Sequence, residues 1–326
     1  MILHADARAL PLVAGCVDCV VTSPPYWGLR DYGHVGQLGL ESTPDAYVAA
    51  LVAVFREVAR VLKPAGTVWL NLGDSYNSSS QNNHGKAGPM PHRHLAPVDG
   101  WAGHRPNAPG LANKNLVGIP WRVAFALQAD GWYLRSDIIW HKPNPMPESV
   151  TDRPTKAHEY LFLLTRSERY WYDGEAIKEP SVDRESYLGR NRRNDDKFAT
   201  HDPNGYARTR VGFAKIEAGR LFETRNARSV WTIPTLPYAG AHFATMPEAL
   251  VEPCILAGCP LGGLVLDPFL GSGTVGAVAE RLGRRWVGTD LAYHDLSTAR
   301  TAQRGLRFEG ATPGRCPNAS ALQRHV

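Results

Sequence analysis

A glycine-rich turn between two apolar segments is one of two places in this sequence where residue types and spacing suggest chemistry. Leu264–Asp267 is typical of a strand that ends in an acidic residue, and Gly271 and Gly273 follow directly. Such glycines let the backbone come close to a ligand and point its N–H groups at it. Asp290 ends the next predicted strand, where a carboxylate accepts hydrogen bonds from ribose hydroxyls. The spacing predicts a site for a nucleoside-containing ligand.

Two classes of ligand fit this turn. Gly271, Gly273 and Gly276 match G-x-G-x-x-G, the pattern of dinucleotide-binding proteins. A dinucleotide would place its anionic pyrophosphate beside Asp267, and the two charges repel. S-adenosylmethionine instead carries a sulfonium and an ammonium, which a carboxylate favours. The charge argument favours the methyl donor, and the dinucleotide is the alternative.

The second chemical motif is Thr22-Ser23-Pro24-Pro25-Tyr26, which follows a short apolar strand beginning at Asp18. The two prolines hold the chain extended and remove two backbone donors, so carbonyl acceptors remain. Ser23 adds a hydroxyl and Tyr26 an aromatic face. Acceptors for an amino group beside a ring for stacking suit a base flipped out of a nucleic-acid helix.

Taken together, the two motifs resemble those of the DNA amino-methyltransferases, which carry [DNS]-P-P-[YFW] in the catalytic loop. The catalytic loop precedes the cofactor turn in this chain, an order similar to that of the permuted β group, and the resemblance covers nearly the whole chain. It implies an α/β, Rossmann-like S-adenosylmethionine-dependent methyltransferase fold with a seven-stranded, mostly parallel sheet. S-adenosylmethionine is the implied cofactor.

The resemblance also assigns roles to individual residues. His242–Pro247 is similar to the motif that holds the amino-acid end of the cofactor, although Phe243 stands where many relatives have proline. Asp6 follows the N-terminal strand, where this group places a residue near the adenine of the cofactor. The implied catalytic residues are Ser23, Pro24, Pro25 and Tyr26. The implied cofactor-binding residues are Asp6, His242, Phe243, Thr245, Asp267, Phe269, Gly271, Ser272, Gly273, Thr274 and Asp290.

Strands and helices must alternate to position these motifs. Apolar residues follow helical spacing from Asp45 to Leu62, with Thr43 or Ser42 as the cap and residues 63–66 as the stop. The alternation predicts a parallel sheet covered by helices. The other expected elements are a helix over Ile119–Ala129, strands over Thr67–Leu72, Ser136–Trp140, Tyr160–Leu164 and Arg285–Asp290, and a helix beginning near Gly273.

Composition divides the chain into parts. We expect residues 1–173 to form the catalytic half, interrupted at 76–114 by a long polar loop rich in Asn, Ser, Gly, Pro and His. Residues 174–228 are expected to be a target recognition segment, 229–310 the cofactor-binding half, and 311–326 a tail.

The segment 174–228 carries much of the excess positive charge of the chain. From Lys178 to Arg228 there are 12 Lys and Arg against 8 Asp and Glu, and the whole chain has a net charge of +5. Phosphate contacts by basic residues supply most of the affinity for DNA. Duplex DNA is therefore the expected partner, with a cognate restriction endonuclease and the oligomeric state left open. The candidates for DNA contact are Arg190, Arg192, Arg193, Arg208 and Arg210.

The expected reaction is methylation of an exocyclic amino group. Hydrogen bonds from the amino N–H groups to Ser23 and to the Pro24 carbonyl would localise the nitrogen lone pair, which could then attack the methyl group directly. Serine at the first motif position favours N4 of cytosine, and N6 of adenine is the alternative. A DNA-binding module without catalysis, and methylation of RNA or protein, are less favoured.

The five cysteines raise other possibilities. Pro253-Cys254 and Cys259-Pro260 resemble the Pro-Cys pair of cytosine-5 methyltransferases, but both fall outside the catalytic half, so we expect them to pack. Cys16 and Cys19 have the spacing of a zinc-ligand pair without a second pair, and no metal is expected. No apolar run approaches the ~18 residues that span a bilayer, so a cytoplasmic protein is expected.

Overall fold

A computed structural model describes residues 1–29, 36–77, 108–181, 224–235 and 246–291. The chain divides into two compact units, one of residues 1–173 and 229–326 and one of residues 174–228. The second unit spans the segment expected to recognise the target, and that role stays a prediction. In the described part of the chain, no helix combines the length and apolar character needed to cross a bilayer.

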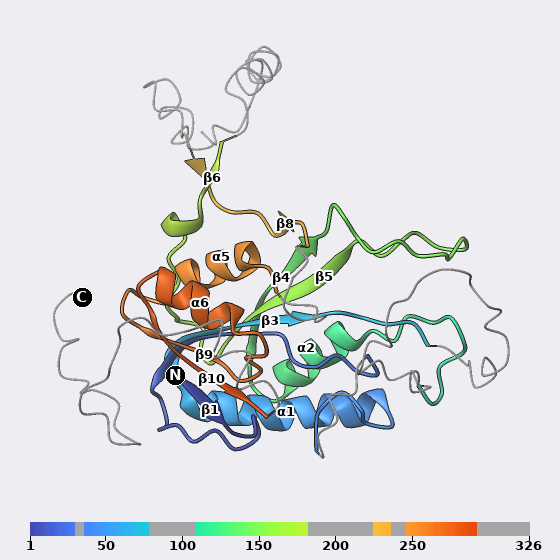
Figure 1. The fold of residues 1–326 in the computed structure, drawn as a ribbon, viewed down its shortest axis with the longest axis horizontal. Helices are drawn as coiled ribbons and strands as arrows, with labels where there is room; N and C mark the ends of the chain where they lie inside the picture. The colour runs from blue at the N-terminus through green and yellow to red at the C-terminus, as the bar shows by residue number, and fades with distance from the viewer. Residues whose placement is uncertain (30–35, 78–107, 182–223, 236–245, 292–326) are drawn as a thin grey trace, which may run out of the picture. The chain divides into compact units, whose positions relative to one another are not determined.

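The first unit is built on one eight-stranded sheet with the order β1-β10-β9-β2-β3-β5-β4-β8 (Figure 1). Neighbouring strands are parallel except that β5 runs antiparallel to both β3 and β4. The α/β, mostly parallel architecture confirms the predicted fold class. The strands are β1 (Ile2–His4), β2 (Val17–Thr22), β3 (Leu62–Leu72), β4 (Tyr133–His141), β5 (His158–Thr165), β8 (Val230–Thr232), β9 (Leu264–Asp267) and β10 (Arg285–Asp290).

The predicted number of seven strands is wrong for this sheet, because β8 adds an eighth. It pairs in parallel with the end of β4, in the register Ile139 to Val230. Three residues are too few to show an alternating pattern in sequence. The strand forms because the edge of β4 offers backbone partners, and Ile139 donates from its N–H to the Ser229 carbonyl at 2.8 Å.

Four helices of at least eight residues are described in this unit: α1 (Pro44–Val61), α2 (Ile119–Ala129), α5 (Glu248–Gly258) and α6 (Thr274–Arg281). The first begins where the Thr43 hydroxyl accepts from the Ala46 N–H at 3.1 Å. Strand β3 starts immediately after α1, so residues 63–66 continue the chain as strand rather than as a separate turn. Lys63 contacts Asp18 of β2 at 2.7 Å, which ties this early part of β3 to its neighbour.

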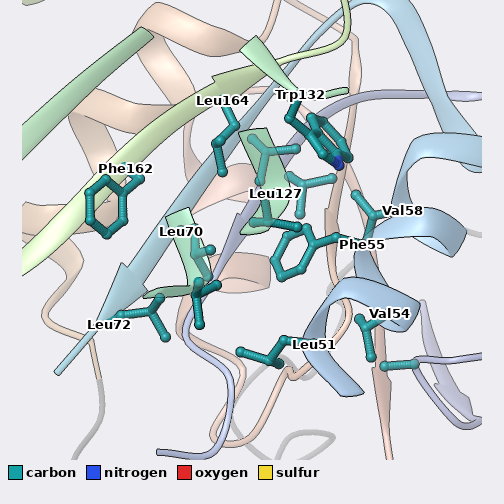
Figure 2. Close-up of a cluster of buried hydrophobic side chains, with 14 of the residues drawn as sticks. Leu51, Val54, Phe55, Val58, Leu70, Leu72, Leu127, Trp132, Phe162 and Leu164 are labelled. Carbon is teal, nitrogen blue, oxygen red and sulfur yellow. The ribbon is translucent and has the colours of Figure 1, made fainter. Parts of the chain in front are cut away.

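The two faces of the sheet are covered by different helices. Alternate residues of β3 point to opposite faces. Leu70 and Leu72 pack with Phe55 of α1 and Leu127 of α2 in the main hydrophobic core (Figure 2). On the other face Thr67 donates to the Gly258 carbonyl of α5 at 3.0 Å. Helices therefore cover both faces, and the carboxyl ends of the parallel strands stay at one edge.

The second unit, by itself, has a short described core. It contains the 3-10 helix η1 (Glu175–Ile177) and the antiparallel pair β6 (Glu179–Pro180) and β7 (Thr224–Arg225). Glu179 accepts from the backbone of Arg228 at 2.9 Å and forms ion pairs with Arg225 and Arg228. This carboxylate therefore links the beginning of the segment to its end.

Candidate active site

The two chemical motifs meet at the carboxyl ends of two adjacent strands. Strands β2 and β9 pair in parallel, with Val20 opposite Leu266. At their ends the Thr22 hydroxyl donates to Asp267 Oδ1 at 2.7 Å. Ligands bind in α/β sheets at this edge, beside the point where the strand order reverses. The hydrogen bond joins the catalytic turn to the glycine turn across 245 residues of sequence.

Asp267 lies in an unusual electrostatic environment. Its side chain is buried and accepts from the Phe269 N–H at 3.0 Å as well as from Thr22. Burial raises the pKa of Asp267 to about 7, and the nearby Asp290 carboxylate adds to this rise, while the hydrogen bonds from Thr22 and Phe269 oppose it. A positive charge at this position would stabilise the ionised carboxylate.

The glycine turn has room for an added Cβ at Gly271 and is tightly packed at Gly276. Gly271 and Gly273 have φ angles of +49° and +80°, and α6 begins at the next residue, Thr274. The Gly271 N–H donates to Asp290 Oδ2 at 2.7 Å, which fixes the acidic end of β10 against the turn. A Cβ at Gly271 would meet no atom closer than 3.8 Å, whereas one at Gly276 would lie 2.8 Å from the Trp286 ring.

These features fit S-adenosylmethionine better than a dinucleotide. An added Cβ would fit at Gly271 without a clash, and Gly276 is explained by packing against Trp286 rather than by a phosphate. Asp267 and Asp290 together make the turn electronegative, which favours a sulfonium or an ammonium and opposes a pyrophosphate. Of the other predicted residues here, Ser272 and Thr274 are buried with their hydroxyl oxygens 3.3 Å apart, and Phe269 is partly buried.

Asp6 lies near the same edge. Strand β1 pairs with β10 so that His4 is opposite Asp290, and Asp6 follows two residues later. Its carboxylate accepts from the Arg8 backbone at 2.8 Å and forms an ion pair with the Arg8 side chain. These contacts hold the pKa of Asp6 below its usual value, so the group stays ionised.

The Ser-Pro-Pro-Tyr turn is held by a contact from α1 and by a contact within the turn. The Tyr47 hydroxyl of α1 donates to the Pro25 carbonyl at 2.8 Å. The Ser23 hydroxyl lies 3.4 Å from the Tyr26 hydroxyl oxygen and donates to it. The four predicted catalytic residues therefore form one fixed turn, with Ser23 and Tyr26 in contact.

Tyr26 is held by residues that were not predicted from the sequence. Its hydroxyl lies 2.7 Å from Glu159 Oε2 and 3.0 Å from Asn71 Oδ1. A Cβ at Gly73 would lie 2.5 Å from the Tyr26 ring, so only glycine allows the ring its place. Burial, followed by the nearby Glu159 charge, raises the pKa of Tyr26 well above its usual value, and the phenol stays protonated.

Lys142 completes this group. It forms an ion pair with the other oxygen of Glu159, Oε1, and its ammonium lies 4.3 Å from the centre of the Trp140 ring. The available signal in the sequence was a polar residue inside each of two apolar strands, Asn71 in β3 and Glu159 in β5. Because β5 is antiparallel to β3, its beginning lies beside the end of β3, at the edge occupied by Tyr26.

Other predicted residues lie outside the described residues. These are the cofactor-binding candidates His242, Phe243 and Thr245 and the DNA-binding candidates Arg190, Arg192, Arg193, Arg208 and Arg210.

The four cysteines among the described residues, Cys16, Cys19, Cys254 and Cys259, are buried. Cys254 lies on α5 and donates to the Leu250 carbonyl at 3.1 Å, and Cys259 caps the same helix. Burial raises the pKa of Cys254 well above its usual value and that of Cys259 to about 12, so neither is a thiolate at neutral pH. Cys19 is buried beside Thr67, and burial raises its pKa as well.

Comparison with known sequences places the chain among DNA methyltransferases. Residues 17–300 match the family described as DNA methylase, the N6 and N4 methyltransferases. The chain is 47% identical to the type II methyltransferase M.Cfr9I of Citrobacter freundii over 296 residues, 90% of this chain and 83% of that protein. It is 46% identical to the type II methyltransferase M.SmaI of Serratia marcescens over 308 residues, 93% of this chain and 91% of that protein.

Solved structures share the fold at lower identity. The PvuII DNA methyltransferase, described as cytosine-N4-specific, aligns with a TM-score of 0.58 at 18% identity and covers 94% of this chain and 87% of its own. A candidate DNA modification methylase of Thermus thermophilus, in complex with S-adenosyl-L-methionine, aligns with a TM-score of 0.53 at 23% identity and covers 92% of both chains.

Proposed function

Because this chain belongs to the DNA methylase family of N6 and N4 amino-methyltransferases, which use S-adenosylmethionine, we propose that its target is the exocyclic N4 of cytosine in duplex DNA. The predicted family and cofactor are thus confirmed, and the choice of base is the proposal. The observation that carries the proposal is a serine at the first position of a Ser-Pro-Pro-Tyr turn that is tied to the cofactor turn by the Thr22–Asp267 hydrogen bond.

The proposed chemistry uses acceptors rather than a strong base. An exocyclic amino group is a poor nucleophile because its lone pair is delocalised into the ring. Ser23 and the Pro24 carbonyl accept hydrogen bonds from its two N–H groups and localise that lone pair on nitrogen. S-adenosylmethionine supplies the electrophilic methyl group. The turn would hold the amino nitrogen in line with the methyl–sulfur bond, so positioning provides much of the rate. As the nitrogen–carbon bond forms, the carbon–sulfur bond breaks, the neutral thioether leaves, and the surplus amino proton passes to water.

The target base must leave the helix to reach this turn. Flipping a base out costs about a few kcal/mol in lost stacking and pairing, and a stacking surface in the enzyme restores part of this energy. In this proposal the Tyr26 ring is that surface. Its hydroxyl contacts to Glu159 and Asn71 support the role, because a ring held at its far end offers a face in a fixed orientation.

The remaining site residues enter the proposal by analogy with the family. His242, Phe243 and Thr245 would hold the amino-acid end of the cofactor. Arg190, Arg192, Arg193, Arg208 and Arg210 would contact phosphates or guanines of the DNA. The structurally similar PvuII methyltransferase is described as specific for cytosine N4, which supports cytosine over adenine here.

The test is to incubate duplex DNA with the purified protein and S-adenosylmethionine and to identify the methylated nucleoside by mass spectrometry. N4-methylcytosine is the expected product. N6-methyladenine would keep the amino-methyltransferase chemistry and overturn the choice of base. A DNA product methylated at cytosine carbon 5 would overturn the mechanism, and Cys254→Ala is the matched variant that would then lose activity.

A further inference from the structure

The hydroxyl of Tyr26 has one hydrogen and faces two acceptors on its inner side. Glu159 Oε2 lies at 2.7 Å and Asn71 Oδ1 at 3.0 Å. A phenol can donate only one hydrogen bond, and it accepts through its oxygen. With acceptors alone on the inner side, the Tyr26 hydrogen must point inward. Its oxygen is then left to accept from Ser23, whose hydroxyl lies 3.4 Å away.

The orientation of Asn71 does not change this result. Its Nδ2 donates to the Tyr160 carbonyl at 3.1 Å, an oxygen that can only accept. The same Nδ2 donates to Glu159 Oε2 at 3.1 Å. Rotating the amide would place its oxygen against two other acceptors, so the amide keeps Oδ1 toward Tyr26.

Glu159 is the fixed end of this chain of hydrogen bonds. Its Oε1 is paired with the Lys142 ammonium, while Oε2 accepts from Tyr26 and Asn71. An ionised carboxylate has no hydrogen to donate, so it can only accept. The two hydrogen bonds are therefore donated in the same sense. The Ser23 hydroxyl donates to the Tyr26 hydroxyl, and the Tyr26 hydroxyl donates to the Glu159 carboxylate.

We propose that Glu159 is a positioning residue that makes Ser23 an acceptor: through Tyr26, it turns the Ser23 hydrogen away from the target base and leaves the serine lone pairs for an amino N–H. The proposal rests on the role of Ser23 given above and deepens it. A serine hydroxyl on its own rotates and can donate or accept. A serine held as an acceptor favours a base with an amino group at the reacting position and disfavours one with a carbonyl oxygen at that position.

The direct test is Glu159→Gln in the full-length protein, measured by single-turnover methylation of duplex DNA. The glutamine amide has one oxygen, whereas Lys142 on one side and Tyr26 with Asn71 on the other both need an acceptor. The NH₂ group of the glutamine then faces either Lys142 or Tyr26 and Asn71. The direction of hydrogen-bond donation between Ser23 and Tyr26 is no longer fixed. We expect the methylation rate to fall about 10- to 100-fold, the range for one charge-assisted hydrogen bond, with cofactor affinity unchanged.

Glu148→Gln is the matched control. Glu148 lies in the connection between β4 and β5, shortly before the strand that carries Glu159, and forms an ion pair with Arg153 at 2.7 Å. Its hydrogen-bond partners are Arg153 and Lys156 rather than Ser23, Tyr26 or Glu159. The same chemical change there should leave the methylation rate at the wild-type value. Equal losses in the two variants would overturn the proposal, because the effect would then follow from the loss of any carboxylate in this region rather than from the contact between Glu159 and Tyr26.

A double-mutant cycle separates positioning from a structural role. Tyr26→Phe keeps the ring and removes the hydroxyl through which Glu159 acts. We expect Tyr26→Phe to slow methylation by a factor similar to Glu159→Gln, and Glu159→Gln to have no further effect once Tyr26 is phenylalanine. Equal rate losses from Glu159→Gln in both backgrounds would overturn the proposal. If Glu159→Gln does not fold, a wild-type rate for Tyr26→Phe would overturn it instead.

The product of the wild-type enzyme distinguishes this inference from the proposed choice of base. Formation of N6-methyladenine would defeat the cytosine assignment, whereas the dependence on Glu159 would remain, since adenine also presents an amino group. A wild-type rate in Glu159→Gln with N4-methylcytosine as the product would defeat the inference and leave the cytosine assignment standing.

Discussion

Asp267 joins the two motifs of the candidate active site. It is buried below the glycine turn, takes a hydrogen bond from Thr22 of the catalytic turn, and lies close enough to Asp290 for their charges to repel. A carboxyl group with a pKa of about 7 is ionised or neutral depending on small changes around it. Binding of a cationic cofactor is one such change.

Cofactor affinity should therefore rise with pH. The ionised fraction of Asp267 grows as pH increases through about 7, and a cation binds the ionised form more tightly, so affinity should increase from pH 6 to 8 and then level off. Thr22→Val removes a hydrogen bond that lowers the pKa, so the midpoint should move to higher pH. Calorimetric titration of S-adenosylmethionine at several pH values measures both.

Asp267→Asn serves as the control for this dependence. It keeps the shape of the side chain and removes the titration, so the rise between pH 6 and 8 should disappear. A rise of the same size in Asp267→Asn would assign the pH dependence to another group.

Helix α5 packs closely against strand β3 in the middle of the sheet. A Cβ on Gly258 of α5 would lie 2.5 Å from the Thr67 hydroxyl and 2.4 Å from Nε1 of Trp69, both on β3. The Trp69 ring is also stacked on Trp231 of β8, with ring centres 6.3 Å apart. The helix can approach the sheet this closely only because residue 258 has no side chain.

Gly258→Ala should accordingly destabilise the fold. Overpacking in a well-filled interior costs about 1–3 kcal/mol of unfolding free energy, and α5 would have to move away from β3. Urea denaturation measures the loss. Glu252→Ala, at a partly exposed position of the same helix where the side chain pairs with Arg281, should change the unfolding free energy by less than about 0.5 kcal/mol. A stability equal to that of wild type in Gly258→Ala would contradict the close packing.

At the scale of the whole molecule, charge is distributed unevenly between the two units. The unit of residues 174–228 has 12 Lys and Arg against 9 Asp and Glu, an excess of three positive charges out of a net +5 for the chain. A polyanion such as DNA is attracted to such a segment, and the attraction weakens as salt is added. The Glu179 contacts to Arg225 and Arg228 close the segment at its base, where those two arginines are already paired.

The triple variant Arg190→Ala, Arg192→Ala and Arg193→Ala tests the proposed DNA contacts. Each phosphate contact contributes about 0.9 to the slope of log affinity against log salt concentration, so losing three should flatten that slope by about 2–3. Fluorescence anisotropy of a labelled duplex measures it, with cofactor affinity unchanged. Arg281→Ala, whose side chain pairs with Glu248 and Glu252, should keep the wild-type slope. An unchanged slope in the triple variant would place the phosphate contacts elsewhere.

Local patterns in the sequence were sufficient for much of the fold. The helix expected over Asp45–Leu62 occupies Pro44–Val61, and the strands Leu264–Asp267 and Arg285–Asp290 begin and end as expected. Apolar spacing, caps and stop signals act over a few residues, so the chain itself carries them. The two chemical motifs, the family and the cofactor were recognised for the same reason, since each motif is contiguous.

Tertiary structure alone decided which residues meet. Strand β8 is too short to have a pattern and exists because β4 has an open edge. Glu159 reaches Tyr26 across 133 residues and Thr22 reaches Asp267 across 245, through a strand order that no local pattern records. A polar residue within an apolar strand shows in sequence that something must satisfy it, since a buried polar group needs a partner. Which group does so depends on the neighbouring strands, and only the assembled sheet determines that.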